Sequence, residues 1–187
     1  AVRTLAADPD AVTELSHRAL ALCDGRGAER TWLASDHEHS AAGRVTLRLA
    51  EAAHVGLLYD WQSAPETRRY AKQATIPTRG EHEAWFARRQ ADPDSLIAMI
   101  ACDGKARGCL RLDRIGETRE RLVSIYLAPG AWGQGIATAA LDLARRLAPG
   151  WRFVAEVLPE NDASHRLFRR AGYHEEQPGT YVREAAA

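Results

Sequence analysis

The sequence has no excess of either charge and no long apolar run, and both absences narrow the possible functions. Lysine and arginine together number 25, and aspartate and glutamate also number 25. Without a net positive field, the chain is not expected to bind nucleic acid or an anionic membrane surface. No apolar run approaches the ~20 residues that a membrane-spanning helix needs, and no signal peptide is visible. We therefore expect a cytoplasmic protein.

Cysteine and methionine are also scarce. The three cysteines, Cys23, Cys102 and Cys109, are odd in number, widely spaced and form no C-x-x-C pair, which indicates a reducing compartment. The polar segment 35–40 holds two histidines and two acids, but its composition favours a solvated linker, and no metal is expected. The single methionine is Met99 and the chain begins at Ala1, so we interpret it as a piece of a longer polypeptide.

The stretch 123–137 combines a strand, a glycine-rich turn and the start of a helix. Apolar and polar residues alternate over 123–127, Pro129 and Gly130 end that strand, and an apolar helical face begins at Ile136. A glycine loop that opens a helix presents unpaired N–H groups and can bind phosphate. The alternative is a tight turn that needs glycine for its own backbone angles. The dinucleotide fingerprint G-x-G-x-x-G is not matched, because the spacing here is G-x-x-G-x-G.

This loop resembles the acetyl-CoA loop of the GNAT family of N-acetyltransferases, written Q/R-x-x-G-x-G/A. Ala128 and Pro129 precede it as in that family, while Trp132 stands at the Q/R position. The resemblance implies that acetyl-CoA is the cosubstrate. It also implies that the cofactor-binding residues are Trp132, Gly133, Gln134, Gly135, Ile136, Ala137 and Thr138.

The order of the expected elements agrees with this resemblance. After a helix-rich segment to about residue 33, we expect a strand, two or three helices, three antiparallel strands, a helix, a strand, a helix and a final hairpin. A Rossmann domain would alternate strand and helix from its start. The predicted fold class is therefore α/β of the α+β type, a GNAT fold with a mixed central sheet flanked by helices. We predict an N-terminal extension and linker over 1–42 and the acetyltransferase domain over 43–187.

A second motif, at 161–173, is similar to the family pattern N-x-x-S-x-x-L-Y/F-x-K/R-x-G-F/Y. It implies cofactor contacts from Asn161, Ser164, Phe168 and Arg170. Asn161 could equally be only a helix cap. Many family members have a tyrosine as general acid where this chain has Phe168, and a phenyl ring cannot donate a proton.

Acyl transfer to an amine requires a base, a donor to the thioester oxygen and a route for the thiolate to leave. In the family, the cofactor arm lies beside the strand before the glycine loop, which implies backbone contacts from Ile125, Tyr126 and Leu127. Glu156 is the candidate base, because a carboxylate is unexpected in the apolar strand 151–158 and partial burial would raise its pKa. The alternative places Glu156 on a solvent-facing side of its strand. Tyr126 is the candidate acid, with Ser124, a water molecule or unaided departure of the thiolate as alternatives.

The acceptor region resembles the sugar-nucleotide N-acetyltransferase of the pseudaminic acid pathway. The matching segments are Trp61-Gln62-Ser63 and Glu81-His82-Glu83-Ala84-Trp85. The resemblance implies that a UDP-linked amino sugar is bound by Trp61, Arg68, His82 and Trp85. A uracil ring could stack on Trp85, and charged His82 and Arg68 could meet the diphosphate. The alternative makes the aromatic residues part of the core.

The segment 24–30 resembles the closing segment of the UDP-sugar hydrolase of the same pathway, which suggests fusion to an upstream hydrolase domain. Two other functions stay open. The domain could acetylate protein amino termini, as the ribosomal-protein acetyltransferases with a looser version of the acceptor pattern do. It could also bind acetyl-CoA only as a sensor.

Overall fold

An eight-stranded mixed sheet forms the centre of the computed structural model, which describes residues 33, 36–73 and 75–185. The strand order is β1-β2-β3-β4-β5-β6-β8-β7, and only the β5–β6 pair is parallel among the described strands. The strands are β1 (Glu38–Ser40), β2 (Gly43–Leu49), β3 (Ser95–Cys102), β4 (Lys105–Arg114), β5 (Glu120–Leu127), β6 (Arg152–Glu156), β7 (His174–Gln177) and β8 (Thr180–Arg183).

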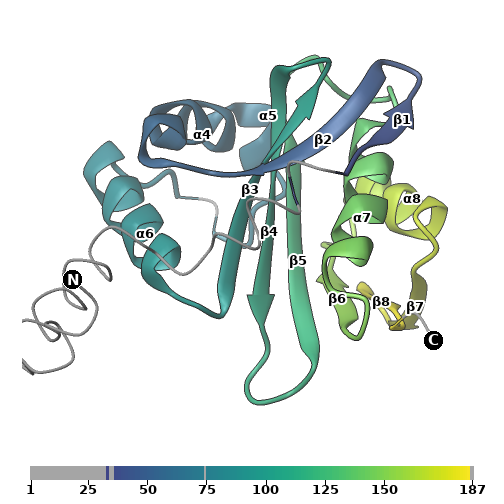
Figure 1. Ribbon diagram of the computed structural model, residues 1–187. Coiled ribbons are helices and arrows are strands. Elements are labelled where there is room, and N and C mark those ends of the chain that lie inside the picture. The colour runs from purple at the N-terminus through teal and green to yellow at the C-terminus, as the bar shows by residue number, and fades with distance from the viewer. Residues whose placement is uncertain (1–32, 34–35, 74, 186–187) are drawn as a thin grey trace, which may run out of the picture.

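Helices cover both faces of this sheet (Figure 1). They are the 3-10 turn η1 (Ala52–His54), α4 (Val55–Ser63), α5 (Pro65–Arg68), α6 (Arg79–Ala91), α7 (Ile136–Leu147) and α8 (Asp162–Arg170). Helices α4 and α6 pack against β4 and β3 on one face, whereas α7 packs against β1, β2 and β5 on the other. Helix α8 packs beside α7 and β7. The predicted mixed sheet flanked by helices is confirmed.

Each face of the sheet has its own apolar core. The larger core lies under α7 and includes Leu110, Val123 and Phe153, while the smaller lies under α4 and α6 and includes Phe86 and Met99. Because both faces are covered, all eight residues of β3 are buried. This explains why β3 reads as a continuous apolar run and not as an alternating one.

Two predicted helix starts are confirmed by their caps. At α6, the Thr78 hydroxyl accepts a hydrogen bond from the Glu81 N–H at 3.2 Å, and Glu81 Oε2 accepts one from the Thr78 N–H at 2.7 Å. This is the capping box that the sequence predicts. At α8, Asn161 Oδ1 accepts from the Ser164 N–H at 3.1 Å. The caps satisfy N–H groups that have no partner within their helices.

The polar segment that we expected to be a linker is in part a strand. Residues 38–40 form the edge strand β1, paired with β2. The acids of this segment hold α7: Arg146 Nε lies 2.8 Å from Asp36 Oδ2, and Arg146 Nη1 lies 3.1 Å from Glu38 Oε2. The linker interpretation is therefore wrong for 38–40, because a charged partner more than 100 positions away cannot be identified from local composition. The helix-rich prediction for residues 1–32 lies outside the described residues.

In the part of the chain that the structure describes, no helix is long and apolar enough to cross a membrane.

The parallel pair of β5 and β6 is short, and its length matters for the site. Strands β5 and β6 are in register only from Glu120 with Arg152 to Leu122 with Val154. Beyond that point β5 continues to Leu127, while β6 pairs with β8. The two strands thus part toward their carboxyl ends.

Candidate functional site

A groove of about 1490 Å³ opens where β5 and β6 part. One half is lined by the end of β5, the glycine loop, the first turn of α7, and α8. The other half is lined by the segment between α5 and α6, by α6 itself and by β4. We call these the cofactor half and the acceptor half, after the roles expected from the sequence.

The backbone of β5 offers donors to the cofactor half. The Ala128 N–H donates to the Arg107 carbonyl on β4 at 2.8 Å, and in an antiparallel ladder the hydrogen-bonding direction alternates along the strand. The backbone groups of Tyr126 therefore face β4, whereas those of Ile125 and Leu127 face the opening toward β6. An extended ligand arm can pair with these two residues as a further strand would.

The glycine loop is shaped to approach a ligand closely. Gly133 and Gly135 have φ angles of +74° and +77°, a left-handed conformation that strains other residues. A Cβ at Gly133 would meet nothing within 4 Å, so the space above it is open to a ligand. The N–H groups of residues 136–138 begin α7 and have no carbonyl one turn earlier in the helix. Such a set of donors fits a pyrophosphate.

Nearly all residues predicted to bind the cofactor line this groove. They are Ile125, Tyr126, Leu127, Trp132, Gly133, Gly135, Ile136, Ala137, Thr138, Asn161, Ser164, Phe168 and Arg170. Gln134 is not among them, because its side-chain Nε2 donates to the Gly130 carbonyl at 3.2 Å and so holds the loop. Phe168 is buried and packs against Tyr173 and Tyr181, which makes it part of the core as well as of the groove wall.

Glu156 lies at the end of β6 and lines the groove. The partial burial that we expected is wrong: its side chain is 46% exposed and forms an ion pair with Lys72. The reason is that β6 alternates in burial, and its last residue reaches the open end of the sheet. Glu156 is thus an accessible carboxylate at the point where the two halves of the groove meet.

Tyr126 lies on the sheet face that α4 covers, with its hydroxyl 3.5 Å from the Leu58 carbonyl. Burial, together with the neighbouring Cys109, raises the pKa of Tyr126 well above its usual range. Burial also raises the pKa of the Cys109 thiol to about 12. Both groups therefore keep their protons at neutral pH. The Tyr126 hydroxyl donates to the Leu58 carbonyl and would have to turn from it to donate to a ligand, and Cys109 is not a nucleophile.

His82 and Trp85 lie together in the acceptor half, as predicted from the spacing on α6. The rings are 5.4 Å apart between centroids, and both residues line the groove. His82 is 2% exposed, and its Nε2 has no hydrogen-bond partner among the described residues. Burial lowers the pKa of His82. Burial thus favours the neutral imidazole over the charged one that we expected from the sequence.

Arg111, which could not be singled out from the sequence motifs, lines the same half of the groove. Its Nε lies 2.7 Å from Asp113 Oδ2, its Nη2 donates to Ser124 Oγ at 3.2 Å, and its guanidinium lies 5.3 Å from the Trp85 ring centroid. Cys109, Arg111 and Asp113 are two residues apart on β4, so period-2 alternation could have placed them on one face. The guanidinium is held in a fixed orientation.

The other two predicted acceptor residues are placed differently. Trp61 does not line the groove and packs, partly buried, against both apolar cores, which agrees with the alternative interpretation of a core residue. Arg68 lines the groove, but its Nη2 is engaged with the Thr75 carbonyl. Arg111 thus presents the more firmly oriented cation of this region.

Comparison with known proteins adds to this geometry. The family model described as "Acetyltransferase (GNAT) domain" matches residues 44–174. A search of curated protein sequences finds no significant match.

Solved structures share the fold. RimJ of Mycobacterium smegmatis in complex with CoA-disulfide superposes with a TM-score of 0.66 at 20% identity, covering 79% of this chain and 83% of that one. Spermidine N-acetyltransferase from Vibrio cholerae, in complex with CoA and spermine, superposes with a TM-score of 0.65 at 18% identity, covering 74% of this chain and 91% of that one. Aminoglycoside acetyltransferase AAC(6')-Ib in complex with coenzyme A superposes with a TM-score of 0.66 at 18% identity, covering 75% of this chain and 94% of that one. At these identities the likeness concerns the fold.

Proposed function

The chain belongs to the acetyltransferase (GNAT) domain family, a class of acetyl-CoA-dependent enzymes, and from this premise we propose that it acetylates the amino group of a nucleotide-linked amino sugar. The observation that carries the choice of acceptor is the acceptor half of the groove. There, a buried imidazole whose Nε2 has no hydrogen-bond partner among the described residues lies together with an indole and a fixed guanidinium.

The cofactor half has the groups needed to hold acetyl-CoA, which supplies a thioester-activated acetyl group. The N–H groups at the start of α7 would hold the pyrophosphate. Those of Ile125 and Leu127 would pair with the extended arm, and one of them would donate to the thioester oxygen, where negative charge develops during attack. Trp132, 49% exposed at the loop, offers a ring where the family pattern has a polar side chain.

We assign the proton transfers of the reaction to side chains of this protein. Glu156 would take a proton from the acceptor's ammonium, directly or through water, and so free its lone pair. The departing thiolate needs no strong acid, because a thiol of pKa ~8.5 is a fair leaving group. Tyr126, which keeps its proton, Ser124 or a water molecule would donate a hydrogen bond to it.

The acceptor half favours an anionic, aromatic ligand over a polycation. Trp85 would stack on a uracil ring, neutral His82 would donate or accept one hydrogen bond, and Arg111 would meet a phosphate. Three carboxylates line the groove, Glu66, Glu81 and Glu156, against six arginine and lysine side chains. Of the three, Glu81 caps α6 and Glu156 is paired with Lys72. This leaves little negative charge to attract polyamines or aminoglycosides.

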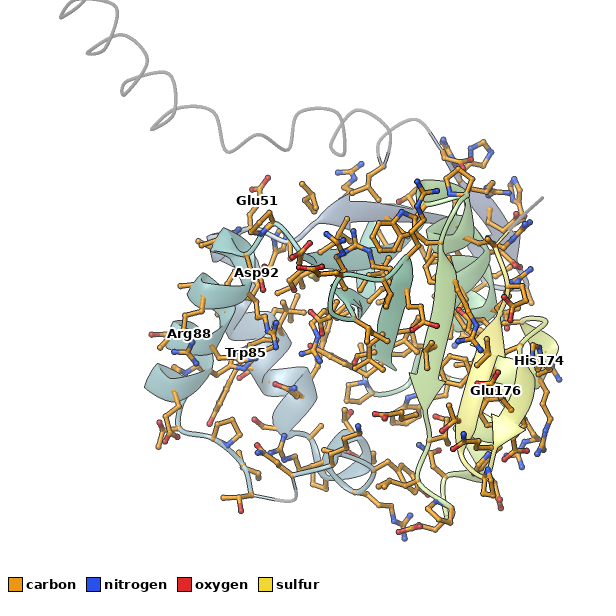
Figure 2. The ribbon with its side chains drawn as sticks, turned by 90° about the horizontal axis from the view of Figure 1, so that it is seen from below. Glu51, Trp85, Arg88, Asp92, His174 and Glu176 are labelled. Carbon is orange, nitrogen blue, oxygen red and sulfur yellow. The ribbon has the colours of Figure 1, made fainter. Side chains whose placement is uncertain are left out.

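A direct comparison of acceptors tests this proposal. UDP-4-amino-4,6-dideoxy sugars and peptides with free amino termini should be assayed with wild type, His82→Ala and Trp85→Ala. Arg88→Ala is the matched control, since Arg88 is exposed on the same helix as Trp85 (Figure 2). We expect both site variants to raise the sugar nucleotide KM and the control to leave it unchanged. Faster acetylation of peptides than of every sugar nucleotide would overturn the choice of acceptor.

That outcome would favour the second candidate, acetylation of protein amino termini. It is supported by the structural likeness to RimJ and to RimL, whose structure is described as a ribosomal L7/L12 alpha-N-protein acetyltransferase. Binding of acetyl-CoA without turnover of any amine would favour the sensor instead. Fusion to an upstream hydrolase, inferred from residues 24–30, and a cytoplasmic location stay predictions.

A further inference from the structure

Lys72 lies where the amine of an acceptor is expected. Its ammonium forms an ion pair with Oε2 of Glu156, the proposed base. Both residues line the main groove, and both also line a smaller adjoining hollow of about 260 Å³. A base removes a proton only from a group within hydrogen-bond reach. An amine in contact with Glu156 therefore occupies the position that an acceptor amine must reach.

We infer that Lys72 is a modification site, acetylated by the protein's own acetyltransferase activity. This inference rests on the proposed function, because it uses acetyl-CoA and Glu156 as base. Glu156 accepts a proton from the Lys72 ammonium, and the freed nitrogen attacks the thioester carbonyl. A C–N bond forms and the C–S bond breaks. The sulfur leaves with the bonding electrons and is protonated, which gives N-acetyl-Lys72, free CoA and one proton released to solvent.

The accessibility of the pair supports the assignment. The side chain of Lys72 is 66% exposed and that of Glu156 is 46% exposed, so neither is sealed inside the protein. Lys72 follows α5 in the segment that forms one wall of the groove. Its long stem places the amine at the groove while its backbone stays at the wall.

The chain supplies an internal control, because only two of its 25 basic residues are lysines, Lys72 and Lys105. Lys105 is exposed at the start of β4 and lines neither hollow. Chemical acetylation by free acetyl-CoA would modify both lysines according to their exposure. Acetylation that depends on the groove would select Lys72.

Acetylation of Lys72 would also change the site. An acetylated lysine has no charge and cannot form a salt bridge, so Glu156 would lose this partner. The carboxylate would then be open to the ammonium of an external acceptor. Self-acetylation would thus convert a groove with an internal amine into one that is open to substrate.

The experiment uses the whole chain and acetyl-CoA with an isotopically heavy acetyl group. Peptide mapping by mass spectrometry gives the labelling rates of Lys72 and Lys105 in wild type and in Glu156→Gln. Because a positioned general base contributes at least about 100-fold, we expect Lys72 to be labelled at least about tenfold faster than Lys105. We expect Glu156→Gln to bring the two rates close together. Lys72→Arg identifies the site, since arginine keeps the charge but is not acetylated.

Equal labelling of the two lysines, or labelling of Lys72 that Glu156→Gln leaves unchanged, would overturn the inference. A rate for Lys72 that increases with protein concentration would also overturn self-acetylation within one molecule. A thermal shift with acetyl-CoA, run in parallel, separates this failure from failure of the proposed function. If acetyl-CoA stabilises the protein and external amines are acetylated while Lys72 is not labelled, the proposed function stands and the modification site is wrong.

Discussion

The two halves of the groove are built from different parts of the chain. The cofactor half consists mainly of backbone: the N–H groups facing the gap beside β5, two glycines in left-handed conformation and the first turn of α7. The acceptor half consists of side chains from separate elements, with His82 and Trp85 on α6 and Arg111 on β4. Glu156 lies between them.

This difference limits what the fold can say about the ligands. A backbone site needs glycines at fixed spacing and tolerates most other changes, and solved structures at 18–20% identity share the fold. A side-chain site changes with each substitution. The same scaffold can therefore accept different amines, and the acceptor has to be argued from residues and not from the fold.

The largest effect is expected from Glu156→Gln, which keeps the shape of the side chain but removes the proposed base between the halves. Turnover should fall by about 10²–10⁴-fold, because proton removal from the amine then has no positioned acceptor. The KM values for acetyl-CoA and acceptor should change little. Steady-state kinetics with both substrates measures this split. A loss confined to acetyl-CoA affinity would assign Glu156 to the cofactor half and not to proton transfer.

Trp85→Ala should weaken binding in the acceptor half of the groove and leave the cofactor half unaffected. Loss of a stacked ring should cost about 1–3 kcal/mol, seen as roughly 5- to 150-fold in the acceptor KM. The KM for acetyl-CoA should stay unchanged, because Trp85 lies on α6, outside the elements of the cofactor half. If both KM values rise together, the two halves of the groove do not bind their ligands independently.

The contrast between a local backbone site and side chains from separate elements also decides which features could be predicted from the sequence. The glycine loop, the capping box at Thr78 and the Asn161 cap are local, and their partners lie within about four residues. Lys72 and Glu156 are 84 positions apart, and Arg111 depends on Trp85 from another element. Such pairs form only when the chain folds. The apolar composition of 151–158 suggested a partly buried Glu156, but composition could not tell that this side chain stays exposed at the end of β6.

Gly133→Ala is the reciprocal test on the cofactor side. A Cβ would find open space here, but a φ of +74° costs a residue with a Cβ about 1–2 kcal/mol. The loop should relax and weaken acetyl-CoA binding by roughly 5- to 30-fold, while acceptor KM stays the same. Gly80→Ala is the control, since Gly80 lies in α6 with φ in the ordinary range and nothing near its Cβ. Equal affinity in both variants would contradict the role of the Gly133 conformation.

The smallest effect is a dependence of stability on pH, and it belongs to the acceptor half alone. Burial lowers the pKa of His82 in the folded protein, whereas in the unfolded chain it returns to its usual value of about 6.5. Between these two values the unfolded state binds a proton that the folded state does not bind. Stability that is present above the unfolded pKa is therefore lost as the pH falls through this range.

His82→Gln should remove this loss, because glutamine keeps a polar group in the pocket but does not titrate. Denaturant midpoints at about pH 7.5 and about pH 5.5 bracket the unfolded pKa on both sides. Wild type should lose more stability between the two conditions than His82→Gln does. His174→Gln removes an exposed histidine from β7, on the far side of the molecule from Trp85 (Figure 2), and should behave like wild type. Equal losses in wild type and His82→Gln would show that the acceptor half admits a charged imidazole. In that case His82 could meet a diphosphate as a cation, and His82 and Arg111 would share its recognition.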